Sequence, residues 1–343
     1  MVAVARMTGS TSALERMLDR ISSTESAVRD RFPLFAAADS GEWTTSRRGS
    51  WAGGFWVGQL WLRARVTDDP RHRAAAETWA QRLEPAIAAD TVTRGLTLWY
   101  GVAAGHRLGL SVTAGQQARA GAARLAATFD AAAGILPWGT AFGEPAEPLI
   151  ARVDGLAGTI PLLAWAGAAH VATRHLATHL RICAAPTGLI PALSRSGAAW
   201  EPRGEPPAGW SRGEAWLLLA LADAAQWLDG DHACLADELL DRWPWPISEI
   251  PAALRQHPEV PDTSAAAITA VALCKLGRPD RAQELVDVLV AHHLSAGDRP
   301  GRLLSGCYDL PRGLATTHEL IWGDFFLMLA LAILSGAVDP TDL

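Results

Sequence analysis

Lysine is almost absent from the 343-residue sequence, in which Lys275 is the only one. A P-loop nucleotide-binding site needs a lysine in its glycine-rich loop, and the setting of Lys275, TAVALCKLGRPD, is no such loop. A Schiff-base mechanism would have to use this same residue. The pattern around it predicts instead the last turn of a helix, where a cation suits the helix dipole.

The sequence also lacks an excess of basic charge, closely spaced cysteine pairs and long apolar segments. The net charge is -6, whereas nucleic-acid-binding domains carry a basic surface, so we expect no nucleic-acid partner. The four cysteines form no CxxC pair, which predicts reduced, mostly buried thiols in a cytoplasmic protein. The N-terminus turns polar before an apolar core of signal-peptide length. The longest apolar run, LIWGDFFLMLALAIL, is interrupted by Asp324 and short for a membrane span, so we expect no membrane partner.

Strand patterns are weak, because runs of alternating β-branched residues are short, whereas helical periodicity recurs along the whole chain. It predicts twelve helices, near residues 11–30, 52–67, 70–89, 92–108, 112–128, 154–167, 168–184, 210–228, 231–242, 262–276, 278–294 and 319–335. The first ten residues or so are expected to be disordered.

The predicted helices alternate in character. Segments such as EAWLLLALADAAQWL are apolar on nearly all sides, and the helices between them are amphipathic, such as TAGQQARAGAARLAATF. A helix that is apolar all round is buried, and an amphipathic one has a solvated face. The alternation predicts an all-α fold, an (α/α)6 barrel with inner and outer rings. A superhelical solenoid of hairpins is the structural alternative.

No Pro/Gly/Ser-rich linker divides the sequence, which predicts a single domain over residues 1–343. Two connections, 129–153 and 185–209, are long enough to be functional loops. The sequence carries no signal for an oligomeric state.

Five unusual strings fall at the starts of predicted inner helices or in the loops before them. They are WAGGFW (51–56), RVDGLAG (152–158), GWSRGEAW (209–216), PDTSAAAI (261–268) and ELIWGDFF (319–326). In this order they resemble the unsaturated glucuronyl hydrolases, glycoside hydrolase family 88, and the related family 105 of unsaturated rhamnogalacturonyl hydrolases. The resemblance extends over roughly residues 40 to 335 and implies an (α/α)6 barrel.

The resemblance also implies a reaction. That family acts on sugars whose terminal uronic acid has a C4–C5 double bond, and it needs no metal. An aspartate protonates C4 and assists addition of water at C5, and the hemiketal then collapses with loss of the glycosidic bond. The matching residue here is Asp154. The implied partner is a small sugar or sugar-derived substrate, with no cofactor.

Two interpretations of Asp154 are open. As a general acid it would need burial to raise its pKa, against the opposing effect of a helix N-terminus. Its place at the start of an apolar helix is equally typical of an N-cap, for which aspartate is among the preferred residues.

Aromatic residues are dense around these strings, with glycines that would let a ligand approach the backbone. Sugars expose flat C–H faces on which rings stack, and the resemblance puts the following at the cavity mouth: Trp51, Phe55, Trp138, Trp210 and Trp216. Trp56 and Trp61 are assigned to the core. The alternative is that all of them are core residues.

Charged residues near these strings allow two roles as well. Arg212 faces the substrate in the resemblance, and a guanidinium suits a sugar carboxylate. Its alternative is an ion pair with Glu214 or Asp262. Asp262 is itself interpreted as an N-cap, and Asp324 as a buried structural acid. Among the histidines, His318 is retained as a site candidate; the following are expected to be solvated: His106, His170, His175, His179, His292 and His293.

The sequence departs from the family in two places. Thr93 and Arg94 stand where the family's HDLGF string has aspartate and leucine, and Ala192 stands where a substrate-binding histidine is expected. If Thr93 and Arg94 line the cavity, the exchange of an acid for a cation predicts an altered, more anionic substrate. The alternative is a catalytically inactive carbohydrate-binding or scaffold protein on the same barrel.

Overall fold

The computed structural model describes residues 2–185, 188–243, 245–246 and 249–343. Met1 and residues 186–187 of the connection at 185–209 lie outside this description. The first helix, α1 (Val2–Val28), begins before residue 11, where the sequence predicted its start.

Six helical segments form a closed inner ring. They are α2 (Gly53–Thr67), the composite helix of α5 (Arg94–Leu96), η1 (Thr97–Ala103) and α6 (Ala104–Arg107), α8 (Thr159–Trp165), α10 (Ser211–Trp227), α12 (Thr263–Lys275) and α14 (Ile321–Leu334). Each packs against the next, and α14 returns to α2. Every residue of α12 is buried, as an inner position requires. The closed ring excludes the solenoid.

Six outer helices cover the ring: α1, α3 (Pro70–Gln81), α7 (Val112–Ala126), α9 (Ala169–Cys183), α11 (His232–Asp241) and α13 (Pro279–His292). In the same order they contact α14, α2, η1, α8, α10 and α12. A short helix, α4 (Glu84–Ile87), follows α3. Side chains of Asp69, Ser111 and Asp231 cap α3, α7 and α11 by accepting backbone N–H bonds. The predicted (α/α)6 barrel is confirmed.

Gly54 of WAGGFW serves helix packing, together with Gly101 of η1. A Cβ on Gly54 would stand 2.6 Å from the Thr97 Cα, and one on Gly101 would stand 2.7 Å from the Gly54 Cα. No side chain fits at either distance, so these glycines allow α2 and η1 to touch backbone to backbone. The sequence interpretation, that they let a ligand approach, is wrong for Gly54.

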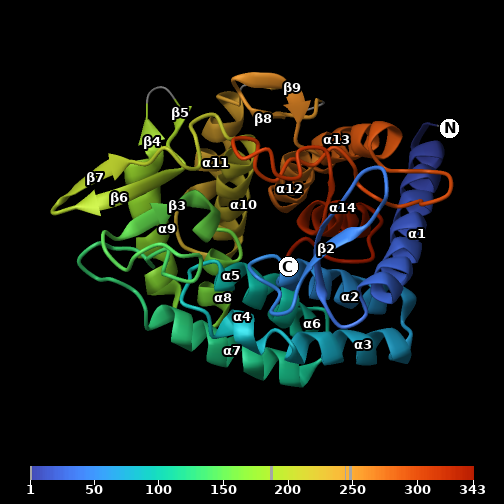
Figure 1. Ribbon diagram of the computed structural model, residues 1–343, viewed down its shortest axis with the longest axis horizontal. Helices are drawn as coiled ribbons and strands as arrows, with labels where there is room; N and C mark the ends of the chain where they lie inside the picture. Colours follow the sequence, from blue (N-terminus) through green and yellow to red (C-terminus); the bar gives the residue numbers. More distant parts are fainter. Residues whose placement is uncertain (1, 186–187, 244, 247–248) are drawn as a thin grey trace.

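Short antiparallel strands occupy the loops at the helix ends, where strand patterns in the sequence are weak. Three-stranded sheets have the orders β10 (Glu319–Leu320), β1 (Phe32–Ala36), β2 (Trp43–Ser46) and β3 (Ile150–Arg152), β6 (Ala192–Ser196), β7 (Ala199–Pro202). Hairpins join β4 (Ala184–Ala185) to β5 (Gly188–Leu189) and β8 (Ala252–Leu254) to β9 (His257–Pro261). The sheet of β3, β6 and β7 lies on the side of the molecule opposite α1 (Figure 1).

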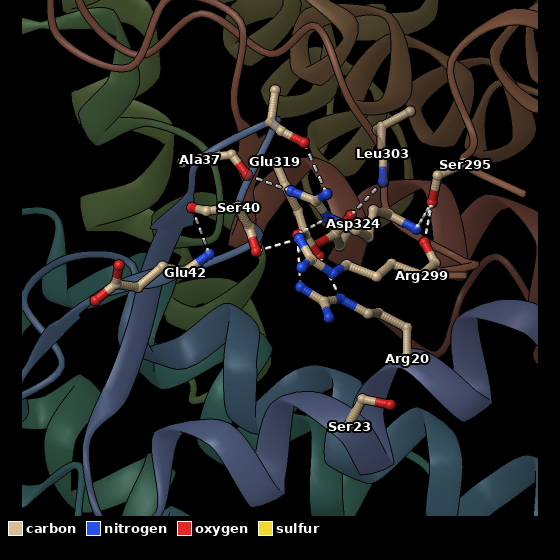
Figure 2. A network of polar contacts seen from close by, with 12 residues as sticks. Arg20, Ser23, Ala37, Ser40, Glu42, Ser295, Arg299, Leu303, Glu319 and Asp324 are labelled. Atoms are coloured by element: carbon tan, nitrogen blue, oxygen red, sulfur yellow. Dashed lines mark hydrogen bonds and ion pairs between the residues drawn. The ribbon is translucent and has the colours of Figure 1, made fainter. Parts of the chain in front are cut away.

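A buried ionic network ties the two ends of the chain together (Figure 2). The fully buried Glu319 accepts hydrogen bonds of 2.7 Å from Arg20 Nε and Nη2 and from Arg302 Nε. Arg302 also donates to the Ala37 carbonyl oxygen at 2.5 Å. Beside it, the buried Asp324 accepts from the Leu303 N–H at 3.0 Å, and burial together with Glu319 raises its pKa well above the usual value. Asp324 is thus the structural acid that the sequence predicted.

No helix of the described ranges combines the length and apolar character that crossing a bilayer requires.

Candidate active site

A pocket of about 360 Å³ opens at the end of the barrel where the inner helices begin. Residues from the starts of these helices and from the loops before them line it, so the closed ring brings distant parts of the sequence together. Seven of the predicted site residues lie in its wall: Trp51, Thr93, Trp138, Asp154, Trp210, Arg212 and Trp216. The volume suits a ligand of small-oligosaccharide size.

Asp154 lies in this wall on a short 3-10 turn, η2 (Val153–Gly155), that follows β3. The α-helix begins only at Thr159, after Gly158 with φ +70°, and no side chain caps it. The helix predicted from residue 154 therefore starts five residues later, because the glycines after Asp154 permit a turn that interrupts it. The N-cap interpretation of Asp154 is wrong.

Arg152 holds both oxygens of Asp154. Its Nε lies 3.0 Å from Oδ1 and its Nη2 lies 2.6 Å from Oδ2, and both side chains retain some exposure, 20% for Arg152 and 14% for Asp154. The same guanidinium lies 4.0 Å above the centre of the Trp138 ring. Arg152 was not among the predicted site residues. The pair depends on the turn from β3 into η2, which the helix expected from residue 154 did not anticipate.

Two buried histidines of α9 stand behind this turn. His175 and His179 are 0% and 1% exposed, and their ring centres are 4.4 Å apart. His179 Nδ1 donates to the His175 carbonyl oxygen, and His175 Nδ1 accepts from the Leu136 N–H. Burial lowers the pKa of His179 to about 4, opposed by the charge of Asp154, and lowers that of His175 well below its usual value. The prediction that these two residues are solvated is wrong.

Arg212 lines the pocket, but its guanidinium is engaged in the structure. Nη1 lies 2.5 Å from Asp262 Oδ2 and 2.5 Å from the Cys307 carbonyl oxygen. Nη2 donates to the Tyr308 carbonyl oxygen at 2.7 Å. Of the alternatives left open, the ion pair is with Asp262, which also caps α12 by accepting from the Ser264 N–H. Arg212 therefore fixes the pocket segment at 307–308.

Aromatic rings form much of the pocket wall. The half-buried Trp51 donates from Nε1 to Tyr308 Oη at 3.1 Å. Tyr308 lines the pocket as well, although it was not among the predicted site residues. Trp210 is half-buried, and Trp138 and Trp216 are buried except toward the cavity. Trp56 and Trp61 are fully buried in the core, as predicted.

Three predicted site residues lie outside the pocket. Phe55 is fully buried inside the ring, where it stacks on Tyr100 with ring centres 5.5 Å apart. Arg94 is buried and donates to Thr128 Oγ1, and this burial lowers its pKa. His318 packs edge-on against Phe35. Local structure keeps each of the three side chains out of the pocket. Phe55 lies within α2, and Arg94 is one helical position past Thr93 and so points in another direction. His318 is held by backbone pairing with Gly306.

Thr93 lines the pocket with an uncharged side chain. It is 3% exposed, and its Oγ1 lies 3.0 Å from Thr91 Oγ1. Ala192, the other departure from the family, is buried on β6 and does not line the pocket. Among the residues that the structure describes, no three His, Cys, Asp or Glu side chains are grouped to hold a metal ion.

No family model and no curated protein sequence matches this chain. Solved structures match along almost its whole length. One designated UGL with dGlcA-Glc-Rha-Glc has a TM-score of 0.84 and 23% identity, over 94% of this chain and 96% of the other. The chain has the fold of the unsaturated glucuronyl hydrolases.

Two further structures of this fold also match this chain over almost its whole length. Unsaturated glucuronyl hydrolase from Bacillus sp. GL1, described as responsible for the degradation of glycosaminoglycan, has a TM-score of 0.83 and 21% identity over 95% of this chain and 96% of its own. A mutant enzyme from Streptococcus agalactiae, complexed with dGlcA-GalNAc6S, has a TM-score of 0.73 and 16% identity over 96% and 92%. At these identities the likeness establishes the fold.

Proposed function

We propose that the pocket is the active site of a glycosidase that hydrates the double bond of an unsaturated uronic acid or related sugar, with altered substrate specificity. The observation that carries the proposal is the placement of Asp154, a partly exposed carboxyl group in a pocket walled by aromatic rings, at the mouth of this particular barrel. A solved neighbour of the same fold is complexed with dGlcA-GalNAc6S, which supports a sugar as the ligand.

Arg152 is the residue that best suits the substrate's carboxylate. Three arginines line the pocket: Arg152, Arg212 and Arg312. The guanidinium of Arg212 is occupied by Asp262 and two carbonyl groups. Arg312 is 65% exposed and pairs with Glu205 and Asp309. Arg152 has one carboxylate partner inside the pocket and a fixed orientation on Trp138, so it can exchange Asp154 for a substrate carboxylate in the same bidentate geometry.

This exchange would release Asp154 for chemistry. On leaving the guanidinium, the Asp154 carboxylate takes up a proton from solvent and donates it to C4. A water molecule then forms a bond to C5 while its own proton passes to the Asp154 carboxylate. The C5 hemiketal then opens to a ketone, and its ring oxygen remains on C1. The C1 hemiacetal expels the aglycone as an alcohol. One water is consumed and Asp154 is regenerated, so no residue besides Asp154 has to carry a proton.

A catalytically inactive carbohydrate-binding protein is the second candidate. It is favoured by Thr93, which leaves the position of the family's second carboxylate without charge, and by the ion pair that engages both oxygens of Asp154. Both candidates use the same pocket.

We further propose a cytoplasmic location, because the sequence contains no CxxC pair. In agreement with reduced thiols, Cys183, Cys274 and Cys307 are buried and free.

The test compares the purified protein with its Asp154→Asn variant on unsaturated uronyl disaccharides, following the absorbance of the conjugated double bond. We expect wild-type turnover and a loss of about 10²- to 10⁴-fold in the variant, the usual contribution of a general acid. Equal rates in both proteins would remove Asp154 from the mechanism. Binding of the disaccharide without turnover by either protein would favour the inactive candidate.

A further inference from the structure

The outer part of the pocket is apolar. Six half-buried or exposed side chains form what we call the apolar rim: Phe142, Pro206, Pro207, Leu310, Pro311 and Leu314. Among the side chains that the structure describes, which begin at residue 12, four large hydrophobic ones are more than a third exposed, and Phe142 and Leu314, each at 41%, are two of them. Single exposed apolar residues are common, but a group of them around one cavity marks a binding surface.

The charged groups between these side chains do not favour an anion. Arg312 is the cation of the rim, and it lies 2.6 Å from Glu205 Oε2 and 3.1 Å from Asp309 Oδ2. Glu144 adds a third carboxylate to this outer part of the pocket, and its Oε2 is buried without a hydrogen-bond partner among the described residues. Three carboxylates against one guanidinium would repel a sulfated or carboxylated group.

The rim is continuous with the part of the pocket that contains Asp154 and Arg152, because the same cavity is lined by both sets. A sugar held by Arg152 must therefore place its aglycone, the group linked to C1, against the rim. Trp138 connects the two parts: Arg152 lies over its ring, and the Phe142 ring centre is 5.7 Å from it.

We infer that the substrate carries an uncharged, apolar ring system as its aglycone, in place of an anionic sugar. This inference rests on the proposed function, since it names the substrate class of the same pocket. It also replaces the sequence-based expectation of a more anionic substrate, which depended on Arg94 lining the cavity. Arg94 is turned away toward Thr128.

Binding of saturated glucuronides, which lack the reactive double bond, tests the inference without turnover. We would titrate wild-type protein with phenyl, methyl and 4-sulfophenyl β-D-glucuronide by calorimetry. We expect the phenyl compound to bind about tenfold or more tightly than the methyl compound, since it buries an additional ring. The sulfophenyl compound should bind more weakly than the phenyl one.

A double variant and a control variant test whether the apolar rim causes the preference for the phenyl compound. Phe142→Ser and Leu314→Ser together should remove most of the preference for phenyl over methyl. Leu235→Ser is the matched control, because Leu235 is similarly exposed, at 37%, but lies on α11 away from the pocket. It should leave the preference unchanged.

Equal affinities for phenyl and methyl compounds, tighter binding of the sulfophenyl compound, or no binding of any compound would overturn the inference. A phenyl preference that depends on Phe142 and Leu314 would support it even if the Asp154→Asn comparison shows no turnover. The two failures are therefore distinguishable.

Discussion

Arg152 and Asp154 form a bidentate ion pair in the pocket wall, with Nε–Oδ1 and Nη2–Oδ2 distances of 3.0 and 2.6 Å. The pair joins residues two apart in the chain, so it is set by local backbone geometry rather than by the closing of the barrel. In the proposed mechanism it is a resting state, which an anionic sugar opens by taking the guanidinium.

Arg152→Gln should weaken recognition of the substrate's carboxylate. We expect KM for an unsaturated uronyl substrate to rise about tenfold or more, since charge-assisted hydrogen bonds contribute about 1.5–3 kcal/mol. The kcat should change much less, because Asp154 remains in place. Steady-state kinetics on the acid and on its methyl ester provide the measurement.

The methyl ester lacks the carboxylate, so its KM should be insensitive to this substitution. Arg203→Gln, an exposed change in the loop after β7, is the control and should alter neither substrate. A similar loss for acid and ester would mean that Arg152 supports the pocket without binding the carboxylate.

Thr93→Asp should restore a carboxylate at the position of the family's second aspartate and raise activity on unsaturated glucuronyl disaccharides. The neighbouring Arg94→Leu should not, because Arg94 lies outside the pocket. Comparing kcat/KM of the two single variants separates their contributions. If Arg94→Leu alone raised activity, the assignment of Arg94 to a position outside the site would be wrong.

The buried histidine pair predicts a loss of stability in mild acid. His179 has a folded-state pKa of about 4 against 6.5 for an unperturbed histidine, so the unfolded chain takes up the proton first. The free energy of unfolding should therefore fall as the pH drops from about 6.5 to 4, with at most about 3 kcal/mol from this residue. Denaturant titrations at several pH values measure the slope.

His179→Gln removes the titrating group and should reduce this slope, and His175 should account for part of what remains. His170→Gln, on the exposed side of the same helix, should leave the slope unchanged. An unaltered slope in His179→Gln would show that other groups cause the acid sensitivity.

The sequence predicted the barrel because its main signal is the alternation between helices that are apolar all round and helices with one solvated face. It missed the strands, which at two to five residues are too short to show a period-two pattern. It also missed the buried histidines, although His175 and His179 lie four apart, on the same face of α9 as the buried Val171, Ala172 and Leu176.

Within the site, the sequence indicated which segments meet but not which side chains face the cavity. Thr93 and Arg94 are consecutive at the start of a helical segment, so their side chains point about 100° apart, and only Thr93 lines the pocket. Ion partners were only partly predictable. The sequence offered Glu214 and Asp262 as alternative partners of Arg212, and only the structure shows that the pair is with Asp262, fifty positions away.

The central claim, that this pocket acts on a carbon–carbon double bond, is tested most directly with two substrates that differ only in that bond. An unsaturated glucuronyl disaccharide and its saturated counterpart would be incubated with wild-type protein in D2O and followed by proton NMR. The account predicts that the unsaturated disaccharide is consumed with one deuterium entering at C4, while the saturated one stays intact. Cleavage of both at comparable rates, or of neither, would contradict it.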